Sequence, residues 1–180
     1  MSDISQNSRN GQKGDTVLLP SSSFLPLVRD DARVLILGSL PGQRSLQEQQ
    51  YYAHPQNAFW RIMQDLIGAG GSYQQRCDAL LNNRLALWDV LAESVRPGSM
   101  DSDIKSDTAR ANDFGSLFTQ YSGIERVCFN GQKAAQMFAK LVGQGVPTDG
   151  KTMLTLPSTS PAHAAMPYEE KLARWRTALQ

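Results

Sequence analysis

Residues 51–60 gather aromatic rings, an imidazole and a carboxamide into one short stretch of the chain. Two of these side chains could do chemistry. The Tyr52 ring offers a flat surface on which a base can stack, and the Asn57 carboxamide can both donate and accept hydrogen bonds. A structural interpretation is also open for Asn57, because it could cap a following helix. Phe59 and Trp60 are expected to be core residues.

A second candidate segment follows a short apolar run and combines two glycines with a proline. Glycine lets a backbone approach a ligand closely, and proline stiffens a turn. The segment matches neither GxGxxG nor a Walker motif. It is therefore either a plain tight turn or a ligand-binding loop, and its members are Gly38, Ser39, Leu40, Pro41 and Gly42.

A third segment places three hydroxyl side chains between prolines, in a loop before the last predicted helix. Ser158, Thr159 and Ser160 stand between Pro157 and Pro161. Hydroxyl groups and backbone N–H groups in a stiff loop suit phosphate oxygens without any net charge. A rigid surface turn is the structural alternative.

Other kinds of catalytic site are poorly supported by the residue types available. The chain has 2 histidines, His54 and His163, and 2 cysteines, and none of them follows a metal-ligand spacing. We therefore expect no metal ion and no cofactor. There is no GxSxG elbow. Asp89 and Asp101 could act as acids, although a solvated or capping role is the preferred interpretation of both.

The composition indicates a globular protein of nearly balanced charge. The 180 residues carry 18 basic and 17 acidic side chains, for a formal net charge of +1. A broad basic footprint for nucleic acid is therefore not indicated. Residues 1–20 are polar and predict a flexible leader, and residues 21–180 predict a single domain. No apolar run is long enough for a membrane helix and no secretory signal is visible, so we expect a cytoplasmic protein.

Strand-like and helix-like segments alternate after the leader. Apolar runs predict strands over residues 34–37, 85–88, 124–129 and 153–156. Helical patterns predict helices over residues 57–67, 111–118, 133–142 and 168–179. This alternation is typical of an α/β fold, in which helices cover both faces of a mostly parallel sheet. The loops after the first, third and fourth strands are therefore expected to line one common rim.

In this order, the motifs resemble the uracil-DNA glycosylase superfamily, and most closely its hypoxanthine-DNA (deoxyinosine) glycosylase family. The motifs that carry the resemblance are GSLPG at 38–42, YAHPQNAFW at 52–60, FNG at 129–131 and LPSTSP at 156–161. The resemblance runs from Arg33 to Trp175. It implies a three-layer α/β/α domain with a central, mostly parallel, four-stranded sheet. It also implies a DNA repair enzyme that flips hypoxanthine out of DNA and hydrolyses its N-glycosidic bond, leaving an abasic site.

The resemblance also implies roles for single residues. Many superfamily members have Asn or Asp where this chain has Leu40, which cannot handle the attacking water. In the hypoxanthine family an Asn of the next motif takes over, and that residue is Asn57, the expected catalytic group. Tyr52 matches an aromatic residue that stacks on the flipped base, and the backbone of residues 38–42 is expected to contact the base. Asn130 could read the base edge or form a turn with its following glycine.

The same resemblance indicates how DNA would be held. Ser158, Thr159 and Ser160 are expected to bind phosphates. Residues 161–166, which include Pro161 and His163, are expected to enter the space that the flipped nucleotide leaves in the DNA base stack. Several relatives have a histidine where this chain has Leu156. Few phosphate contacts predict a shallow salt dependence, with the cations of the DNA face drawn from Arg44, Arg61, Lys105, Lys133 and Lys151.

Two alternatives stay open beside a monomeric hypoxanthine-DNA glycosylase. The base could be uracil, xanthine or a mismatched thymine, because the side chains that shape the pocket cannot be placed from sequence. The domain could also be a non-catalytic module that binds a nucleotide or phosphorylated metabolite, with Leu40 as a mark of lost chemistry. No lysine stands out as a Schiff-base nucleophile, so a monofunctional enzyme without a β-lyase step is expected.

Overall fold

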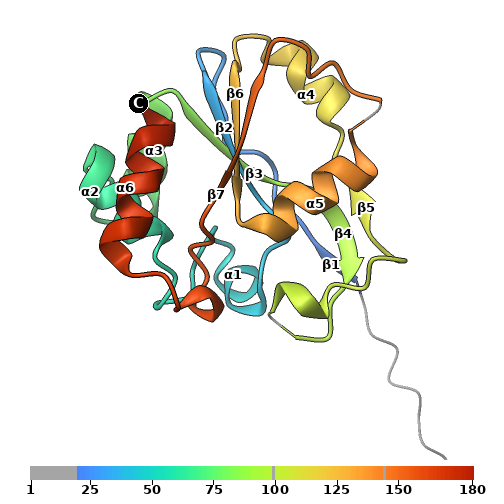
Figure 1. Ribbon diagram of the computed structural model, residues 1–180, viewed down its shortest axis with the longest axis horizontal. Coiled ribbons are helices and arrows are strands. Elements are labelled where there is room, and N and C mark those ends of the chain that lie inside the picture. Colours follow the sequence, from blue (N-terminus) through green and yellow to red (C-terminus); the bar gives the residue numbers. More distant parts are fainter. Residues whose placement is uncertain (1–19, 99, 144) are drawn as a thin grey trace, which may run out of the picture.

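A parallel sheet of four strands, in the order β3-β2-β6-β7, forms the centre of the protein (Figure 1). The computed structural model describes residues 20–98, 100–143 and 145–180. The four strands are β2 (Val34–Gly38), β3 (Leu85–Asp89), β6 (Arg126–Asn130) and β7 (Thr152–Leu156). Every residue of β2 and β3 is buried. Their continuous apolar runs follow from this, because a sheet covered on both faces exposes neither side of a central strand.

Helices cover the two faces of this sheet (Figure 1). One face carries α2 (Phe59–Ile67), α3 (Tyr73–Asn82) and α6 (Tyr168–Leu179), and the other carries α4 (Phe114–Gln120) and α5 (Gln132–Leu141). Successive residues of β2 pack in the hydrophobic cores on opposite faces of the sheet. Ile36 packs in the core that holds Phe59, and Leu37 packs in the core that holds Phe114. The predicted three-layer α/β/α fold with a four-stranded parallel sheet is confirmed.

A second, antiparallel sheet lies outside the central one, and its strand order is β1-β4-β5. Its strands are β1 (Pro20–Ser22), β4 (Leu91–Val95) and β5 (Arg110–Ala111). β4 follows β3 after a single residue, Val90, so the chain passes directly from the central sheet into the second one. This sheet was not predicted.

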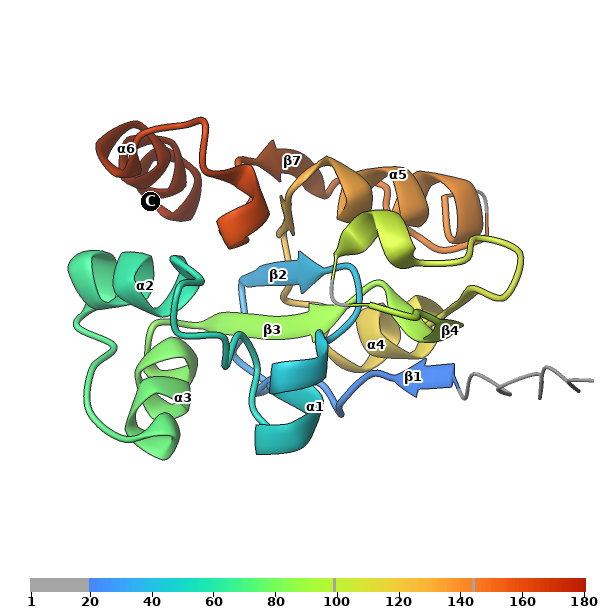
Figure 2. The ribbon, with the colours of Figure 1, turned by 90° about the horizontal axis from the view of Figure 1, so that it is seen from below.

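The parallel register brings the carboxyl ends of the four central strands to one edge. Gly38 is opposite Asp89, and Asn130 is opposite Leu156. Three short helical segments lie along the same edge. This edge is at the lower end of the molecule in Figure 1 and faces the viewer in Figure 2. The three segments are α1 (Gln43–Glu48), η1 (Asp101–Asp103) and η2 (Pro161–His163). The expectation of one common rim is therefore confirmed.

Some sequence predictions differ from the structure. The helix expected over 111–118 begins at Phe114, because Ala111 pairs with Leu91 in the second sheet. α1 and α3 were not predicted. The expected leader, residues 1–20, lies outside the described residues except for Pro20, which begins β1. Among the described residues, none of the helices has the length and apolar character needed to cross a membrane.

Candidate active site

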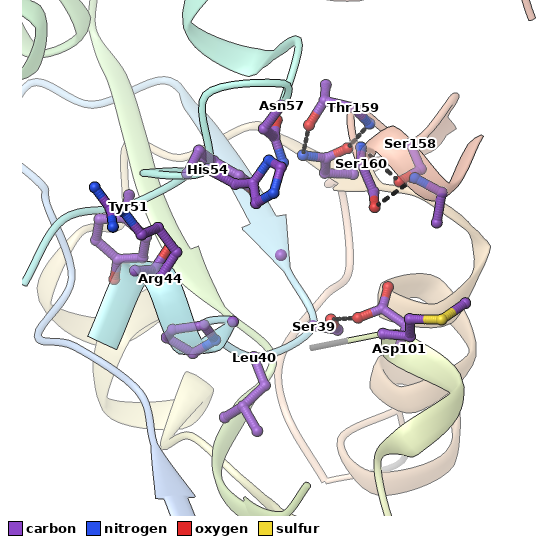
Figure 3. A pocket seen from close by; sticks show the side chains of 18 of the residues that line it. Ser39, Leu40, Arg44, Tyr51, His54, Asn57, Asp101, Ser158, Thr159 and Ser160 are labelled. Atoms are coloured by element: carbon purple, nitrogen blue, oxygen red, sulfur yellow. Dashed lines mark hydrogen bonds between the residues drawn. The ribbon is translucent and has the colours of Figure 1, made fainter. Parts of the chain in front are cut away.

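The loops at the carboxyl edge of the sheet enclose a cavity of about 220 Å³ (Figure 3). It is smaller than the roughly 300–1,000 Å³ typical of sites for drug-sized ligands, which suits a single nucleobase. All but one of the predicted site residues line it. Those residues are Gly38, Ser39, Leu40, Pro41, Gly42, Tyr52, Asn57, Asn130, Ser158, Thr159, Ser160 and Pro161. The exception is His163, which is exposed on η2 and does not line the cavity.

All the backbone carbonyl groups of residues 38–42 accept hydrogen bonds from other parts of the protein. The Gly38 and Ser39 carbonyls accept from the N–H groups of Val90 and Leu91 at 2.8 and 3.0 Å. The Gly42 carbonyl accepts from an N–H of α1 at 3.1 Å. The N–H groups of Ser39, Leu40 and Gly42, by contrast, donate no hydrogen bond to the described part of the chain. A set of unused N–H groups beside a cavity can bind a carbonyl oxygen or an anion.

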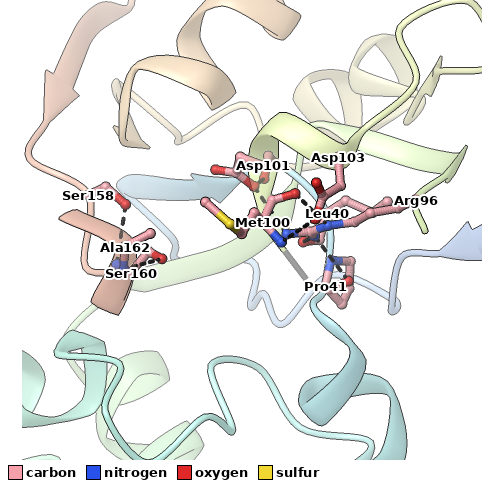
Figure 4. Close-up of polar contacts among 10 residues, drawn as sticks. Leu40, Pro41, Arg96, Met100, Asp101, Asp103, Ser158, Ser160 and Ala162 are labelled. Atoms are coloured by element: carbon pink, nitrogen blue, oxygen red, sulfur yellow. Dashed lines mark hydrogen bonds and ion pairs between the residues drawn. The ribbon is translucent and has the colours of Figure 1, made fainter. Parts of the chain in front are cut away.

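Arg96 engages the two remaining carbonyls of this loop (Figure 4). Its Nη1 donates to the carbonyl oxygens of Leu40 at 2.8 Å and Pro41 at 3.4 Å. Its Nη2 lies 3.4 Å from Asp101 Oδ1, and the Ser39 hydroxyl donates to that same oxygen at 2.5 Å. The Arg96 side chain is only 4% exposed, and burial lowers its pKa. This guanidinium therefore fixes the loop from the protein interior.

Leu40 contributes its backbone to the site and its side chain to the core. The residue is 5% exposed and packs in the core of α4 and α5. In Figure 3 its side chain points away from the residues around the cavity. An apolar side chain turned into the core presents no polar group to the cavity.

Asn57 lines the cavity and is held in place by a local turn. Its Oδ1 accepts a hydrogen bond from the N–H of Phe59, the first residue of α2, at 3.0 Å, and its own N–H donates to the His54 carbonyl at 2.9 Å. The next N–H, that of Ala58, donates to the Thr159 carbonyl at 2.9 Å. The carboxamide thus has a fixed orientation, and one lone pair and its amino group stay available. The N-cap role considered from sequence is not observed, because Ala58 is the N-cap residue of α2 and Asn57 precedes it, accepting from the first N–H of the helix.

Tyr52 occupies a strained backbone position in the cavity wall. Its φ angle of 53° is in the left-handed region, which costs a non-glycine residue about 1–3 kcal/mol. Its ring stacks on Phe59 with a centroid distance of 4.1 Å. Its buried hydroxyl makes no hydrogen bond to any described residue, and burial raises its pKa. Strain of this kind together with an unsatisfied buried hydroxyl is characteristic of a functional position.

Asn130 and Thr159 hold two loops together at the cavity wall. Asn130 is 7% exposed and Thr159 is 1% exposed. Each donates one hydrogen bond to the other, and Ala58 adds a third contact to the same loop. A side chain as buried as that of Thr159 is placed to brace the loop, which differs from the expectation that it contacts a phosphate. Ser158 and Ser160 remain on the rim, where each accepts a hydrogen bond from a nearby N–H.

Asp89, like Arg96, lines the cavity but was not predicted as a site residue from the sequence. A solvated or capping role was expected, but the residue is 4% exposed and lines the cavity. Burial raises the pKa of its carboxyl to about 7, and a hydrogen bond from the Ser23 hydroxyl at 3.1 Å opposes part of that rise. Gly38 makes room for it, because a Cβ at that position would lie 2.6 Å from Asp89 Oδ1. The partial signal in the sequence was its place at the end of a buried strand.

Comparisons with known proteins agree with this geometry. The family model of the uracil DNA glycosylase superfamily matches residues 25–179. A curated hypoxanthine DNA glycosylase of Methanosarcina acetivorans is 37% identical over 143 residues, which is 78% of this chain and 86% of that protein. Its counterpart from Methanosarcina barkeri is 36% identical over 72% of this chain and 83% of that protein.

One solved structure extends the similarity to three dimensions. It is a solution NMR structure of a Methanosarcina acetivorans protein provisionally described as a uracil DNA glycosylase. The two chains share 32% identity and a TM-score of 0.74, over 89% of this chain and 97% of the other. The overall fold of this chain is therefore similar to that of this solved structure.

Proposed function

The chain belongs to the uracil-DNA glycosylase superfamily, and from this premise we propose that it is a monofunctional hypoxanthine-DNA glycosylase. It takes deoxyinosine out of the DNA stack, hydrolyses the N-glycosidic bond and leaves an abasic site. Extrusion is required because the glycosidic bond is inaccessible inside a duplex, and a deaminated, poorly pairing base costs less to extrude. The proposal includes a monomer that needs no metal ion and acts in the cytoplasm.

The observation that carries this proposal is the contrast between Leu40, whose side chain is buried in the core, and Asn57, whose carboxamide lines the cavity. Leu40 is turned into the core, and Asn57 presents a carboxamide of fixed orientation to the cavity. Cleavage with oxocarbenium character needs a positioned water more than a strong base. Asn57 holds that water against the sugar carbon C1′. The oxygen of the water bonds to C1′ and gives up one proton to solvent, while the bond from C1′ to the base breaks. The base leaves with the bonding electrons and takes up a proton from solvent.

The first loop receives the base. In the proposed mechanism, the N–H groups of Ser39, Leu40 and Gly42 donate to the carbonyl oxygen of hypoxanthine, where negative charge grows as the base leaves. This is supported by their lack of an acceptor among the described residues and by the position of these residues in the cavity lining. Tyr52 offers its ring as a wall of the same cavity. Asn130 hydrogen-bonds to the edge of the base through the side-chain hydrogen-bonding positions that its two bonds to Thr159 do not use. Ser158 and Ser160 bind phosphates at the rim, and residues 161–166 fill the space that the base vacates.

A panel of damaged duplexes tests the base assignment. Each duplex carries one deoxyinosine, deoxyuridine, deoxyxanthosine or mismatched thymidine, and alkali cleaves the abasic sites that form. We expect hypoxanthine to be released fastest. Faster release of uracil would instead assign uracil as the substrate base, which is the second candidate and the one that the description of the solved relative favours. No release of any base with the enzyme in excess would support the non-catalytic module.

A further inference from the structure

A second groove opens beside the cavity and shares part of its wall. It encloses about 400 Å³, and His54 and Asn57 line both spaces. Three arginines from successive helices line the groove: Arg44 on α1, Arg61 on α2 and Arg76 on α3. In Figure 2, α1 lies at the carboxyl edge of the sheet, and α2 and α3 lie at the side of the sheet. We call this surface the arginine groove.

The arginine groove is positive although the whole chain is nearly neutral. Its one acidic lining residue, Glu48, pairs with Arg44 at 2.8 Å. Arg61 and Arg76 form no salt bridge within the described part of the chain. Two guanidinium groups without a carboxylate partner at salt-bridge distance among the described residues therefore line this groove, in a protein whose formal net charge is only +1.

Aromatic rings and a carbonyl hold these two guanidinium groups in place. The Arg61 guanidinium lies 3.6 Å from the centre of the Tyr168 ring, whose hydroxyl donates to Asp65 at 2.6 Å. Arg76 Nε donates to the Gly71 carbonyl at 3.0 Å, and its guanidinium lies 5.8 Å from the centre of the Trp60 ring. Stacking leaves the edges of a guanidinium free, and those edges match two phosphate oxygens.

We propose that the arginine groove binds the sugar-phosphate backbone of the damaged strand on one side of the flipped nucleotide. The inference rests on the proposed function, which already brings DNA to the neighbouring cavity. A strand whose base enters the cavity past His54 and Asn57 has its flanking phosphates beside the groove. Guanidinium groups bind phosphate in two-pronged, charge-assisted hydrogen bonds. The hydroxyl loop at Ser158 and Ser160 holds the strand on the other side without charge.

The test is a measurement of DNA binding that needs no catalysis. The probe is a fluorescent duplex with one tetrahydrofuran abasic analogue, and its association constant is measured across a range of KCl concentrations. The slope of log K against log [salt] is negative, and each lost phosphate contact reduces its magnitude by about 0.9. We therefore expect the double variant Arg61→Gln/Arg76→Gln to have a slope smaller in magnitude than that of the wild type by about 1.8. The Arg61→Lys/Arg76→Lys variant keeps its charges and should keep the slope.

The control is Arg33→Gln, which removes one positive charge before the amino end of β2, where Arg33 pairs with Glu125 at 2.7 Å. Its slope should equal that of the wild type, and thermal melting verifies the fold of every variant. A double Gln variant with the wild-type slope would overturn the proposal. An enzyme that binds through the groove but releases no base would instead overturn the proposed function, so the two failures are distinguishable.

Discussion

Asn130 and Thr159 form a closed pair of hydrogen bonds across the cavity wall. The Asn130 side-chain Nδ2 donates to the Thr159 hydroxyl at 2.8 Å, and the Thr159 backbone N–H donates back to the Asn130 side-chain Oδ1 at 2.9 Å. The pair joins the end of β6 to the loop that follows β7. Gly131 allows this approach, because a Cβ there would lie 2.9 Å from the Ser158 Cβ. Two loops that are distant in sequence therefore form one rigid wall.

Thr159→Val should weaken both the fold and the reaction. The substitution keeps the shape of the side chain but removes the hydroxyl, which leaves the buried Asn130 amide without its partner. An unsatisfied buried group costs about 1–3 kcal/mol, and we expect that loss in the free energy of unfolding measured by chemical denaturation. Single-turnover excision should slow as well. Thr159→Ser, which keeps the hydroxyl, should stay near the wild type in both measurements, and equal losses in the two variants would contradict this role.

Asp89 should make the stability of the protein depend on pH. Burial raises the pKa of its carboxyl to about 7 in the folded state, against about 3.9 in an unfolded chain. Between these values the folded protein binds the proton and the unfolded chain does not. The stability that this proton provides is therefore complete below about pH 4 and is lost as the pH rises to about 7.

Asp89→Asn isolates that effect, because the amide does not titrate. Chemical denaturation at several pH values between 4 and 8 should show the free energy of unfolding of the wild type falling relative to that of the variant. Parallel curves for the two proteins would show that Asp89 is ionised in the folded state over this range.

Gly38→Ala should disturb the floor of the cavity. The added Cβ would lie 2.6 Å from Asp89 Oδ1 and 3.1 Å from the Tyr52 hydroxyl, so both side chains must move. A displacement of about 1 Å near reacting groups can cost about 10²-fold in rate, and we expect a loss of that order in single-turnover excision. Gly145→Ala is the matched control, since nothing lies within 4 Å of its Cβ position. Equal rates in the two variants would argue against a tightly packed floor.

Arg96→Gln should release the first loop. The carbonyls of Leu40 and Pro41 would lose their common donor, and the free energy of unfolding should fall by about 1–3 kcal/mol. Because the proposed mechanism has the loop N–H groups act in the transition state, kcat should fall more than KM rises. Arg174→Gln removes an exposed pair with Glu170, so both its stability and its kinetics should stay close to the wild type. A pure KM effect in Arg96→Gln would show that the loop serves ground-state binding.

The elements that were predicted are those whose own residues determine their structure. β2 is a continuous apolar run, and α6 was predicted over the residues that the structure shows, 168–179. The second sheet was missed because β1 and β5 contain only 3 and 2 residues, too few for a periodic pattern. α3 was missed because it buries only Cys77 and Leu80, which gives it a weak apolar face.

The cavity-lining residues that belong to short sequence motifs were predicted. Those that are brought to the cavity by contacts between residues distant in sequence were missed. The loop at residues 38–42 and Asn57 are visible in the sequence, because glycine, proline and a carboxamide occur in recognisable order. Asp89 is buried beside Ser23, 66 residues away, and Arg96 reaches Leu40 across 56 residues. Partners at such separations leave no local pattern. A buried charge cannot be told from a solvated one until the fold brings its neighbours together.

The central claim is that Asn57 positions the water that attacks deoxyinosine. Asn57→Ser tests it most directly, because a serine hydroxyl can replace the turn-forming contact to the Phe59 N–H while the carboxamide is lost. Single-turnover release of hypoxanthine from a deoxyinosine duplex should fall by about 10²–10³-fold, with duplex affinity and melting temperature unchanged. A variant that releases hypoxanthine at the wild-type rate would contradict the claim.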